Sequence, residues 1–265
     1  MELIQEQQQA KHTLQNKAQL WNHALNFIRS MSLKCAIELG IPDVLHSHGK
    51  PITLSELATF LSIPPPKTPA LGSLMRLLVH SGLFASHRHQ GGGEEEGYFL
   101  TPTSELLVIK EGVCISPFAL MILNWTLLAP AHKLGEWFRT EAVGPTPFDM
   151  MHGKGFFEET NARADFNELF NKAMASDARL VTEVALLRRQ WEVLRGVRSV
   201  VDVAGGTGTL AKAIAKALPG VRCMVLDLPH VVGTVDEEDR EGVEYIGGDM
   251  FEHIPPADAV LLKVG

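Results

Sequence analysis

The residues most able to do chemistry lie in the last third of the chain, beginning with a glycine-rich run. VVDVAGGTG, at residues 200–208, is the pattern of a buried strand that passes into a tight turn. Glycines let a backbone approach a ligand closely, and the helix predicted over residues 210–218 would present free N–H groups at the same place. This run by itself also satisfies the dinucleotide fingerprint through Gly206, Gly208 and Ala211, so a nicotinamide cofactor is one alternative.

Two aspartates follow at the ends of the next two predicted strands. Asp227 ends the second strand, where a carboxylate can accept hydrogen bonds from both ribose hydroxyls. Asp249 ends the third, placed to accept from an adenine amino group while Met250 packs on the ring. One carboxylate for ribose and one for adenine, with no pyrophosphate cradle, predict a nucleoside ligand, and S-adenosylmethionine fits. The competing interpretation is that both aspartates only cap their loops.

Asp202 also argues against a nicotinamide cofactor. It lies inside the first strand just before the loop, where nicotinamide sites usually have only apolar residues. The elements that must position these residues are short β-branched runs at 200–203, 223–226, 243–246 and 259–264, which alternate with helices. Such alternation predicts a parallel sheet in an α/β domain.

The first part of the chain has a different pattern, and residues 112–196 are predicted to be mostly helical. Its predicted elements begin with an amphipathic helix at 14–39 and a helix at 53–61 that opens with a capping box. A third helix at 70–80 and a β-hairpin of residues 83–85 with 98–100 follow. This order is the winged-helix arrangement. Its third helix carries only Arg76 as a base and its wing tip is acidic, so dimerisation or substrate covering is favoured over DNA binding.

The composition limits the partners and the compartment. The 265 residues carry a net charge of -7, which does not favour nucleic acid. Cys35, Cys114 and Cys223 are scattered and match no metal spacing, so they are expected to be reduced thiols. The polar N-terminus lacks the apolar segment of a signal peptide, and no stretch is apolar and long enough for a membrane span. A cytoplasmic protein without a metal site is expected.

Four motifs in this order and spacing make a resemblance specific: VDVAGGTG, VLDLPHVV, GGDMF and PPADAVLLK, at 201–208, 225–232, 247–251 and 255–263. Together with RLLVHSGLF and FNELFNKAMASDARLV they resemble the plant O-methyltransferases that act on phenolic substrates. The resemblance covers nearly the whole chain, and is nearest to members that methylate stilbenes, flavonoids or isoflavonoids. It implies a winged-helix dimerisation domain over residues 1–111, followed by an incomplete doubly wound, Rossmann-like methyltransferase sheet over residues 112–265, an α/β fold.

The resemblance also implies roles for single residues. The loop would hold the methionine moiety, Asp227 the ribose, and Asp249 with Met250 the adenine, with Lys263 beside the cofactor; the loop residues are Ala204, Gly205, Gly206 and Gly208. The phenolic substrate would be clamped by apolar side chains at helical spacing, namely Phe166, Phe170 and Met174, with Asp177 at a position that varies with substrate. The competing interpretation of these three is a buried helix face.

The sequence departs from the family pattern in two places. Ala204 replaces the first glycine of the usual VDVGGGTG, and its methyl group would disfavour a positive φ. In the family, the lysine is followed by a tryptophan and then a His-Asp pair whose His is the catalytic base; here Val264 and Gly265 follow Lys263. The base is therefore expected to lie beyond residue 265, and the 265-residue chain to be inactive. The first alternative is a truncated product able only to dimerise. An NAD oxidoreductase ranks third.

Overall fold

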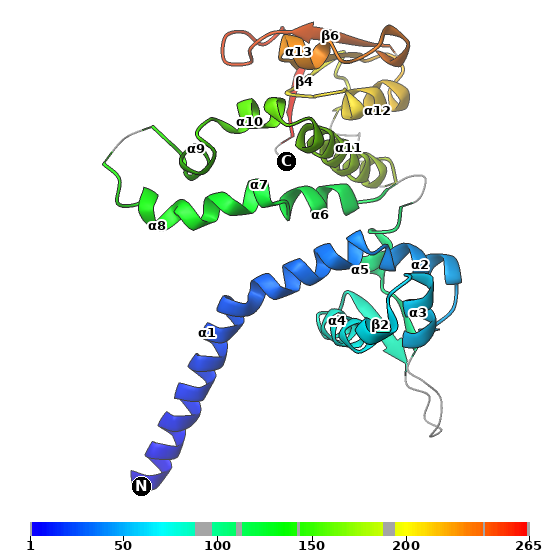
Figure 1. Ribbon diagram of the computed structural model, residues 1–265. Coiled ribbons are helices and arrows are strands. Elements are labelled where there is room, and N and C mark those ends of the chain that lie inside the picture. The colour runs from blue at the N-terminus through cyan, green and yellow to red at the C-terminus, as the bar shows by residue number, and fades with distance from the viewer. Residues whose placement is uncertain are drawn as a thin grey trace. The chain divides into compact units, whose positions relative to one another are not determined.

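The computed structural model describes residues 2–87, 97–109, 113–141, 144–187, 194–240 and 242–263. The chain divides into two compact units, Met1–Ile109 and Lys110–Gly265. Each unit has its own hydrophobic core. Figure 1 labels the elements of both. In the described residues, no helix combines the length and the apolar character that crossing a membrane requires.

The first unit opens with one long helix, α1 (Glu2–Glu38). It begins well before residue 14, where apolar spacing alone predicted its start. Half of residues 2–13 are glutamine or glutamate, which are good helix formers and add no apolar period to detect. The helix ends at Glu38, and the predicted stop at Gly40 follows it with a left-handed φ of 73°, which glycine adopts without strain.

The remaining elements of the first unit follow the winged-helix order. The helices are α2 (Ile41–His48), α3 (Leu54–Phe60), α4 (Thr68–His80) and α5 (Pro102–Glu105), with a 3-10 turn η1 at Pro65–Lys67. The predicted capping box opens α3, because the Thr53 hydroxyl accepts from Glu56 N at 3.2 Å and a Glu56 carboxylate oxygen accepts from Thr53 N at 2.9 Å. The predicted acidic wing tip lies outside the described residues.

A three-stranded antiparallel sheet completes this unit. It consists of β1 (Ile52–Thr53), β3 (Gly97–Leu100) and β2 (Phe84–His87), in that order, so the predicted hairpin is confirmed. The helices and the sheet enclose one apolar core, built chiefly from Ala36, Ile41, Leu45, Ile52, Leu57, Met75, Leu78 and Phe84.

Helices form the first part of the second unit. They are α6 (Ser116–Ile122), α7 (Trp125–Leu128), η2 (Ala129–Lys133), α8 (Leu134–Trp137), α9 (Pro147–His152), α10 (Phe156–Ala162) and α11 (Ala164–Leu187). A break in the helical region precedes Pro147, and α9 begins there with a Thr146–Asp149 capping box. The long helix α11 packs against α6.

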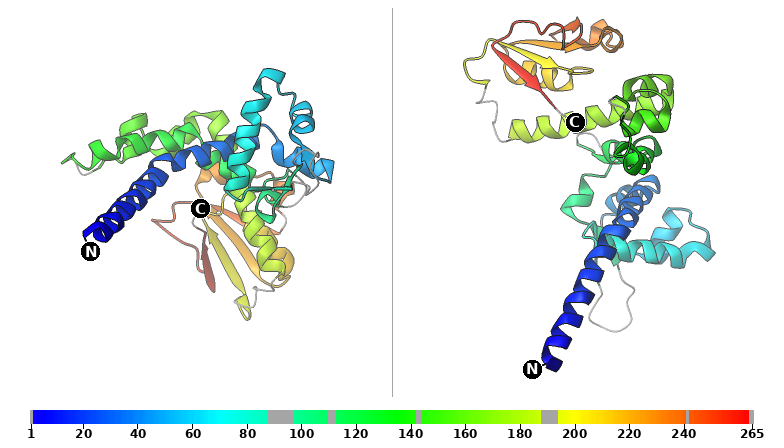
Figure 2. Two further views of the ribbon diagram at one scale, coloured as in Figure 1. Left: turned by 90° about the horizontal axis from the view of Figure 1, so that it is seen from below. Right: turned by 90° about the vertical axis from the view of Figure 1, so that its left-hand side faces the viewer.

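A four-stranded parallel sheet forms the rest of the second unit (Figure 2, yellow to red). Its elements are β4 (Ser199–Val203), α12 (Thr209–Ala217), β5 (Arg222–Asp227), α13 (Pro229–Val232), η4 (Glu237–Arg240), β6 (Val243–Gly247) and β7 (Ala259–Leu262). The order β6-β5-β4-β7 is the 3-2-1-4 order expected of a doubly wound sheet. β7 is shorter than predicted and is an edge strand that pairs with β4, and Val264 lies outside the described residues.

Side chains of β4 and β5 alternate between the two faces of the sheet. One face packs with α12 and carries Val200, Cys223 and Val225. The other carries a smaller apolar layer of Val201, Val203, Met224 and Leu226. Strands buried on both faces fix the register of the sheet, and the register brings the carboxyl ends of β4, β5 and β6 to one edge.

Candidate functional site

The loop between β4 and α12 has the backbone conformation of an anion-binding turn. Ala204 N continues the strand by donating to Leu226 O at 2.8 Å. The chain then alternates through left-handed residues, with φ values of 57° at Ala204, 58° at Gly206 and 77° at Gly208. Alternation of this kind turns successive backbone N–H groups toward one side of the loop. The helix α12 starts immediately after it, at Thr209.

Two positions in the loop require glycine for steric reasons. A Cβ at Gly205 would lie 2.9 Å from Cγ of Asp202, and one at Gly208 would overlap the hydroxyl of Tyr245. At Gly206, by contrast, a Cβ would meet no atom within 4 Å, so the loop has open space beside it there. The loop therefore packs tightly on its sheet side and leaves room on the other, as a close backbone approach to a ligand requires.

Ala204 is strained where glycine would not be, as the sequence comparison with the family pattern anticipated. A left-handed alanine costs roughly 1 to 2 kcal/mol, and the greater unfolded-state entropy of glycine offsets about half of that. We expect Ala204→Gly to raise the free energy of unfolding by about 0.5 to 1 kcal/mol in denaturant titrations. Ala213→Gly, inside α12, is the matched control and should lower it by about 1 kcal/mol. A loss of stability in both variants would show that φ at Ala204 is not strained.

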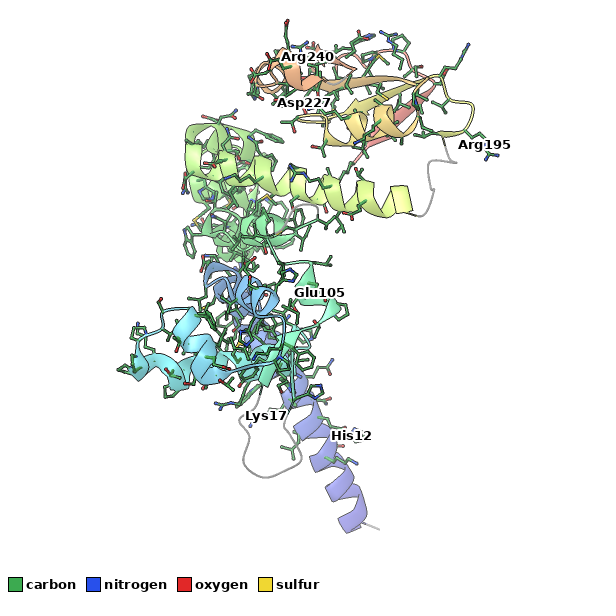
Figure 3. The ribbon with its side chains drawn as sticks, turned by 90° about the vertical axis from the view of Figure 1, so that its right-hand side faces the viewer. His12, Lys17, Glu105, Arg195, Asp227 and Arg240 are labelled. Carbon is green, nitrogen blue, oxygen red and sulfur yellow. The ribbon has the colours of Figure 1, made fainter. Side chains whose placement is uncertain are left out.

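Asp227 connects the three loops at the carboxyl edge of the sheet. Its Oδ2 accepts from Gly206 N at 2.8 Å, and its Oδ1 accepts from Leu228 N at 2.7 Å. Its backbone oxygen accepts from Gly248 N at 3.0 Å, in the loop after β6. Asp227, labelled in Figure 3, thus holds the glycine-rich loop and the third loop at the end of its own strand. A carboxylate has about four lone-pair sites, so acceptor capacity is left for a ligand.

Asp249 and Met250 lie in the turn after β6. Because β6 ends at Gly247, Asp249 follows the strand by two residues and does not end it as predicted. Its Oδ1 accepts from Phe251 N at 2.9 Å, so this aspartate, like Asp227, makes the loop-capping bond of the competing interpretation. Met250 is half-buried against the apolar layer that includes Val203. Capping and ligand binding are compatible, because each carboxylate keeps unused lone pairs.

Asp202 is a buried carboxyl behind the loop. It is 3% exposed, and burial raises its pKa to about 6. The positive charge of Lys263 opposes the rise in pKa, while the negative charge of Asp227 adds to it. The three groups therefore lie within electrostatic reach of one another at one edge of the sheet.

Lys263 joins the end of β7 to the long helix α11. Its ammonium forms an ion pair with the carboxylate of Asp177, and both side chains are about four-fifths buried. The pair fixes the ammonium on the α11 side of the sheet, within electrostatic reach of Asp202. No local pattern pairs these two residues, because 85 positions of chain separate them.

The three residues expected to clamp a substrate lie together on α11. Phe166 is 1% exposed and packs with Met121 and Ala173, so it belongs to the core of this region. Phe170 and Met174 are half-buried at the border of the same cluster. Asp177 follows Met174 by less than one helical turn, so this helix face leads toward the ion pair with Lys263.

Tyr245 also lies at this site and was not among the predicted site residues. Its hydroxyl donates to Thr207 O at 2.9 Å, and the Arg240 guanidinium lies over its ring at 5.6 Å from the centroid. The available signal was the period-2 alternation of β6, which places residue 245 on the same face as the buried Val243. Nothing in the sequence indicates that this side chain reaches across β5 to the first loop.

The fold and the loop geometry define a class of α/β proteins in which a glycine-rich loop follows the first strand of the parallel sheet, here β4, and a carboxylate ends the next strand, here β5. The family model described as O-methyltransferase domain matches residues 131–264, and that described as O-methyltransferase dimerisation domain matches residues 21–110. The chain belongs to the plant O-methyltransferase family, which is S-adenosylmethionine-dependent. The resemblance found in the sequence is thereby confirmed.

Curated relatives support this assignment over most of the chain. The chain is 50% identical over 250 residues to trans-resveratrol di-O-methyltransferase of Vitis vinifera, covering 94% of this chain and 69% of the relative. It is 47% identical over 257 residues to 8-hydroxyquercetin 8-O-methyltransferase of Mentha piperita, again covering 94% and 69%. The similarity therefore extends through both units.

Solved structures share the fold. The pyocyanin biosynthetic protein PhzM is 27% identical with a TM-score of 0.69, over 94% of this chain and 71% of that chain. Human N-acetylserotonin methyltransferase, solved with S-adenosylmethionine, is 21% identical with a TM-score of 0.71, over 93% and 70%. At 21% identity, the similarity to the human enzyme concerns the fold alone.

Proposed function

We propose that the chain binds S-adenosylmethionine at the carboxyl edge of its parallel sheet, and that the protein transfers the methyl group to a hydroxyl of a plant phenolic. The observation that carries the proposal is the bonding of Asp227, which joins the glycine-rich loop, its own strand end and the Gly248 loop. The relatives support the acceptor class, since their names specify resveratrol, 8-hydroxyquercetin and eugenol, which are phenols.

Different residues bind the methionine, ribose and adenine parts of the donor. The loop of Ala204, Gly205, Gly206 and Gly208 approaches the methionine moiety with its backbone, and Asp227 accepts from the ribose hydroxyls. Asp249 accepts from the adenine amino group while Met250 packs on the ring, and Lys263 lies beside the donor. When bound, S-adenosylmethionine supplies a methyl group on a sulfonium. The buried charge of Asp202 stabilises a cation placed at this edge.

The acceptor is an aromatic hydroxyl held near α11. Phe170 and Met174 offer half-buried apolar surface backed by Phe166 and Phe156, whose ring centroid lies 5.5 Å from that of Phe170. A free phenol has a pKa near 10, so a base that removes its proton is worth roughly 10² to 10⁴ in rate. We expect no turnover from residues 1–265 alone, because the family resemblance assigns that base to a histidine after Lys263.

Equilibrium dialysis of the 265-residue chain with labelled S-adenosylmethionine tests the proposal, followed by turnover assays on stilbenes, flavonoids and caffeic-type acids. Saturable binding supports the proposed donor site. Dimers with no affinity for the donor would instead support the alternative in which the chain only dimerises. Methyl transfer by the 265-residue chain would contradict the assignment of the base.

The helix α1 of the dimerisation domain carries a run of exposed apolar side chains, which predicts how the chain self-associates. Trp21 is 57% exposed and Leu25 is 49% exposed, and they lie on one face with Leu14 and Ile28. We propose that a second copy covers this face in a two-fold homodimer. The double variant Trp21→Glu with Leu25→Glu should sediment as a monomer at micromolar concentration.

The matched control places two glutamates on the opposite face of the same helix, at Gln19 and Asn26, away from the exposed Leu20 and Phe27 as well. This control should remain dimeric, because it leaves the apolar face intact. Equal dissociation of both double variants would show that α1 contributes only through its charge, and a monomeric wild-type chain would contradict the dimer itself.

A further inference from the structure

Tyr245 reaches the glycine-rich loop from two strands away. It lies on β6, and the strand order β6-β5-β4 puts β5 between it and the loop. Alternation along β6 turns Val243 and Tyr245 toward the α12 face, while Glu244, which bonds Arg222 of β5 at 2.6 Å, is exposed. The tyrosine ring therefore crosses the α12 face of the sheet to meet the loop where α12 begins.

Two consecutive loop residues meet this one side chain. The hydroxyl of Tyr245 donates to Thr207 O at 2.9 Å. The same hydroxyl occupies the place that a Cβ of Gly208 would need. The Arg240 guanidinium lies over the ring of Tyr245, which restricts ring motion further.

The bond to Thr207 has a consequence for the next residue, because a peptide unit is planar. The carbonyl of Thr207 and the N–H of Gly208 belong to one plane and point in opposite directions. Gly208 N donates to Gly205 O at 2.9 Å, which closes the turn. Fixing the carbonyl thus fixes the turn, and the turn sets the direction of Gly206 N, which donates to Asp227.

We infer that Tyr245 is a positioning residue for the donor: it holds the glycine-rich loop in its binding conformation before the donor arrives, and its hydroxyl adds to the left-handed φ of Gly208 a second reason for glycine at residue 208. The inference rests on the proposed function and deepens it. A loop held in one conformation binds more tightly than one that must be ordered by its ligand, since apparent affinity falls with the population of the competent state.

Tyr245→Phe removes the hydroxyl and keeps the ring. Titration of the 265-residue chain with S-adenosylhomocysteine should then show an affinity about 3- to 10-fold weaker, as expected for one lost hydrogen bond. Glu244→Gln is the matched control on the same strand, and it should bind as tightly as the wild type. Wild-type affinity in Tyr245→Phe would overturn the inference.

Amide hydrogen exchange in the ligand-free chain separates positioning from general stability. In Tyr245→Phe, the amides of Gly206 and Gly208 should exchange faster while that of Val225, in the centre of β5, is unchanged. Faster exchange throughout β5 and β6 would mean that the tyrosine only stabilises the sheet. If the wild type binds no S-adenosylhomocysteine, the proposed function fails, and the exchange result still decides the role of Tyr245.

A double-mutant cycle tests the link to residue 208. Gly208→Ala should weaken S-adenosylhomocysteine binding strongly in the wild-type background, because its methyl group overlaps the tyrosine hydroxyl and its left-handed φ is strained for alanine. With Tyr245→Leu the overlap is relieved, so the double variant should bind no more weakly than Gly208→Ala alone. Losses that simply add would show that the two residues act independently.

Discussion

Replacing Asp227 by alanine is expected to weaken S-adenosylhomocysteine binding by about 1.5 to 3 kcal/mol, roughly 10- to 150-fold. Two effects combine in this loss. The ribose hydroxyls would lose the charged acceptor proposed for them, and Gly206 N would lose the carboxylate to which it donates at 2.8 Å. Isothermal titration of the variant and the wild type measures the difference directly.

Asp258→Ala is the matched control for this variant. Asp258 also caps a backbone N–H of the sheet region, accepting from Arg198 N at 2.8 Å, but it does so at the opposite end of β4. The Asp258→Ala variant should be less stable than the wild type but should bind S-adenosylhomocysteine with the same affinity. An Asp227→Ala protein that binds like the wild type would remove Asp227 from the site.

The second large effect concerns the pH dependence of stability, which Asp202 should govern through its buried carboxyl. Its pKa is raised to about 6 by burial, against about 3.9 in an unfolded chain. Between these values the folded state holds a proton that the unfolded state has released, so this contribution to stability is present below about pH 4 and lost as the pH rises through 6. About two pKa units correspond to roughly 2 to 3 kcal/mol.

Asp202→Asn removes this titration. We expect the free energy of unfolding of the variant, relative to the wild type, to rise by roughly 2 to 3 kcal/mol between pH 4 and pH 8 in urea titrations. Asp258→Asn should show a constant difference from the wild type over this range, because the backbone N–H of Arg198 lowers the pKa of Asp258, and its stabilising effect is therefore complete above about pH 4 and is lost only as the pH falls further. A difference for Asp202→Asn that is constant with pH would contradict the raised pKa.

Local patterns predicted the fold well where one strong signal acted alone. The Thr53–Glu56 capping box, the stop at Gly40 and the four β-branched runs each marked an element that the structure contains. The predicted start of α1 was wrong, because residues with high helix propensity but no apolar spacing leave no period to detect. Similarly, the two-residue gap between β6 and Asp249 could not be seen, since strand ends depend on pairing with β5.

The site was predictable in its residue types and unpredictable in its connections. Asp227 was singled out as a ligand group, yet its bonds to Gly206 and Gly248 depend on the strand register. The Lys263–Asp177 ion pair and the Tyr245–Thr207 bond join residues far apart in sequence, and such tertiary contacts leave no periodic trace. Ala204 is the exception, since its replacement of a glycine already indicated the left-handed backbone that the structure has.

We expect the edge of the sheet at the ends of β4, β5 and β6 to bind a nucleoside sulfonium donor and not a dinucleotide. Parallel titrations of the 265-residue chain with S-adenosylhomocysteine and with NADH test it most directly. We predict saturable binding of S-adenosylhomocysteine that Asp227→Ala weakens, and no saturable binding of NADH over the same concentration range. Binding of NADH with equal or greater affinity, weakened by the same substitution, would contradict the account and favour an oxidoreductase.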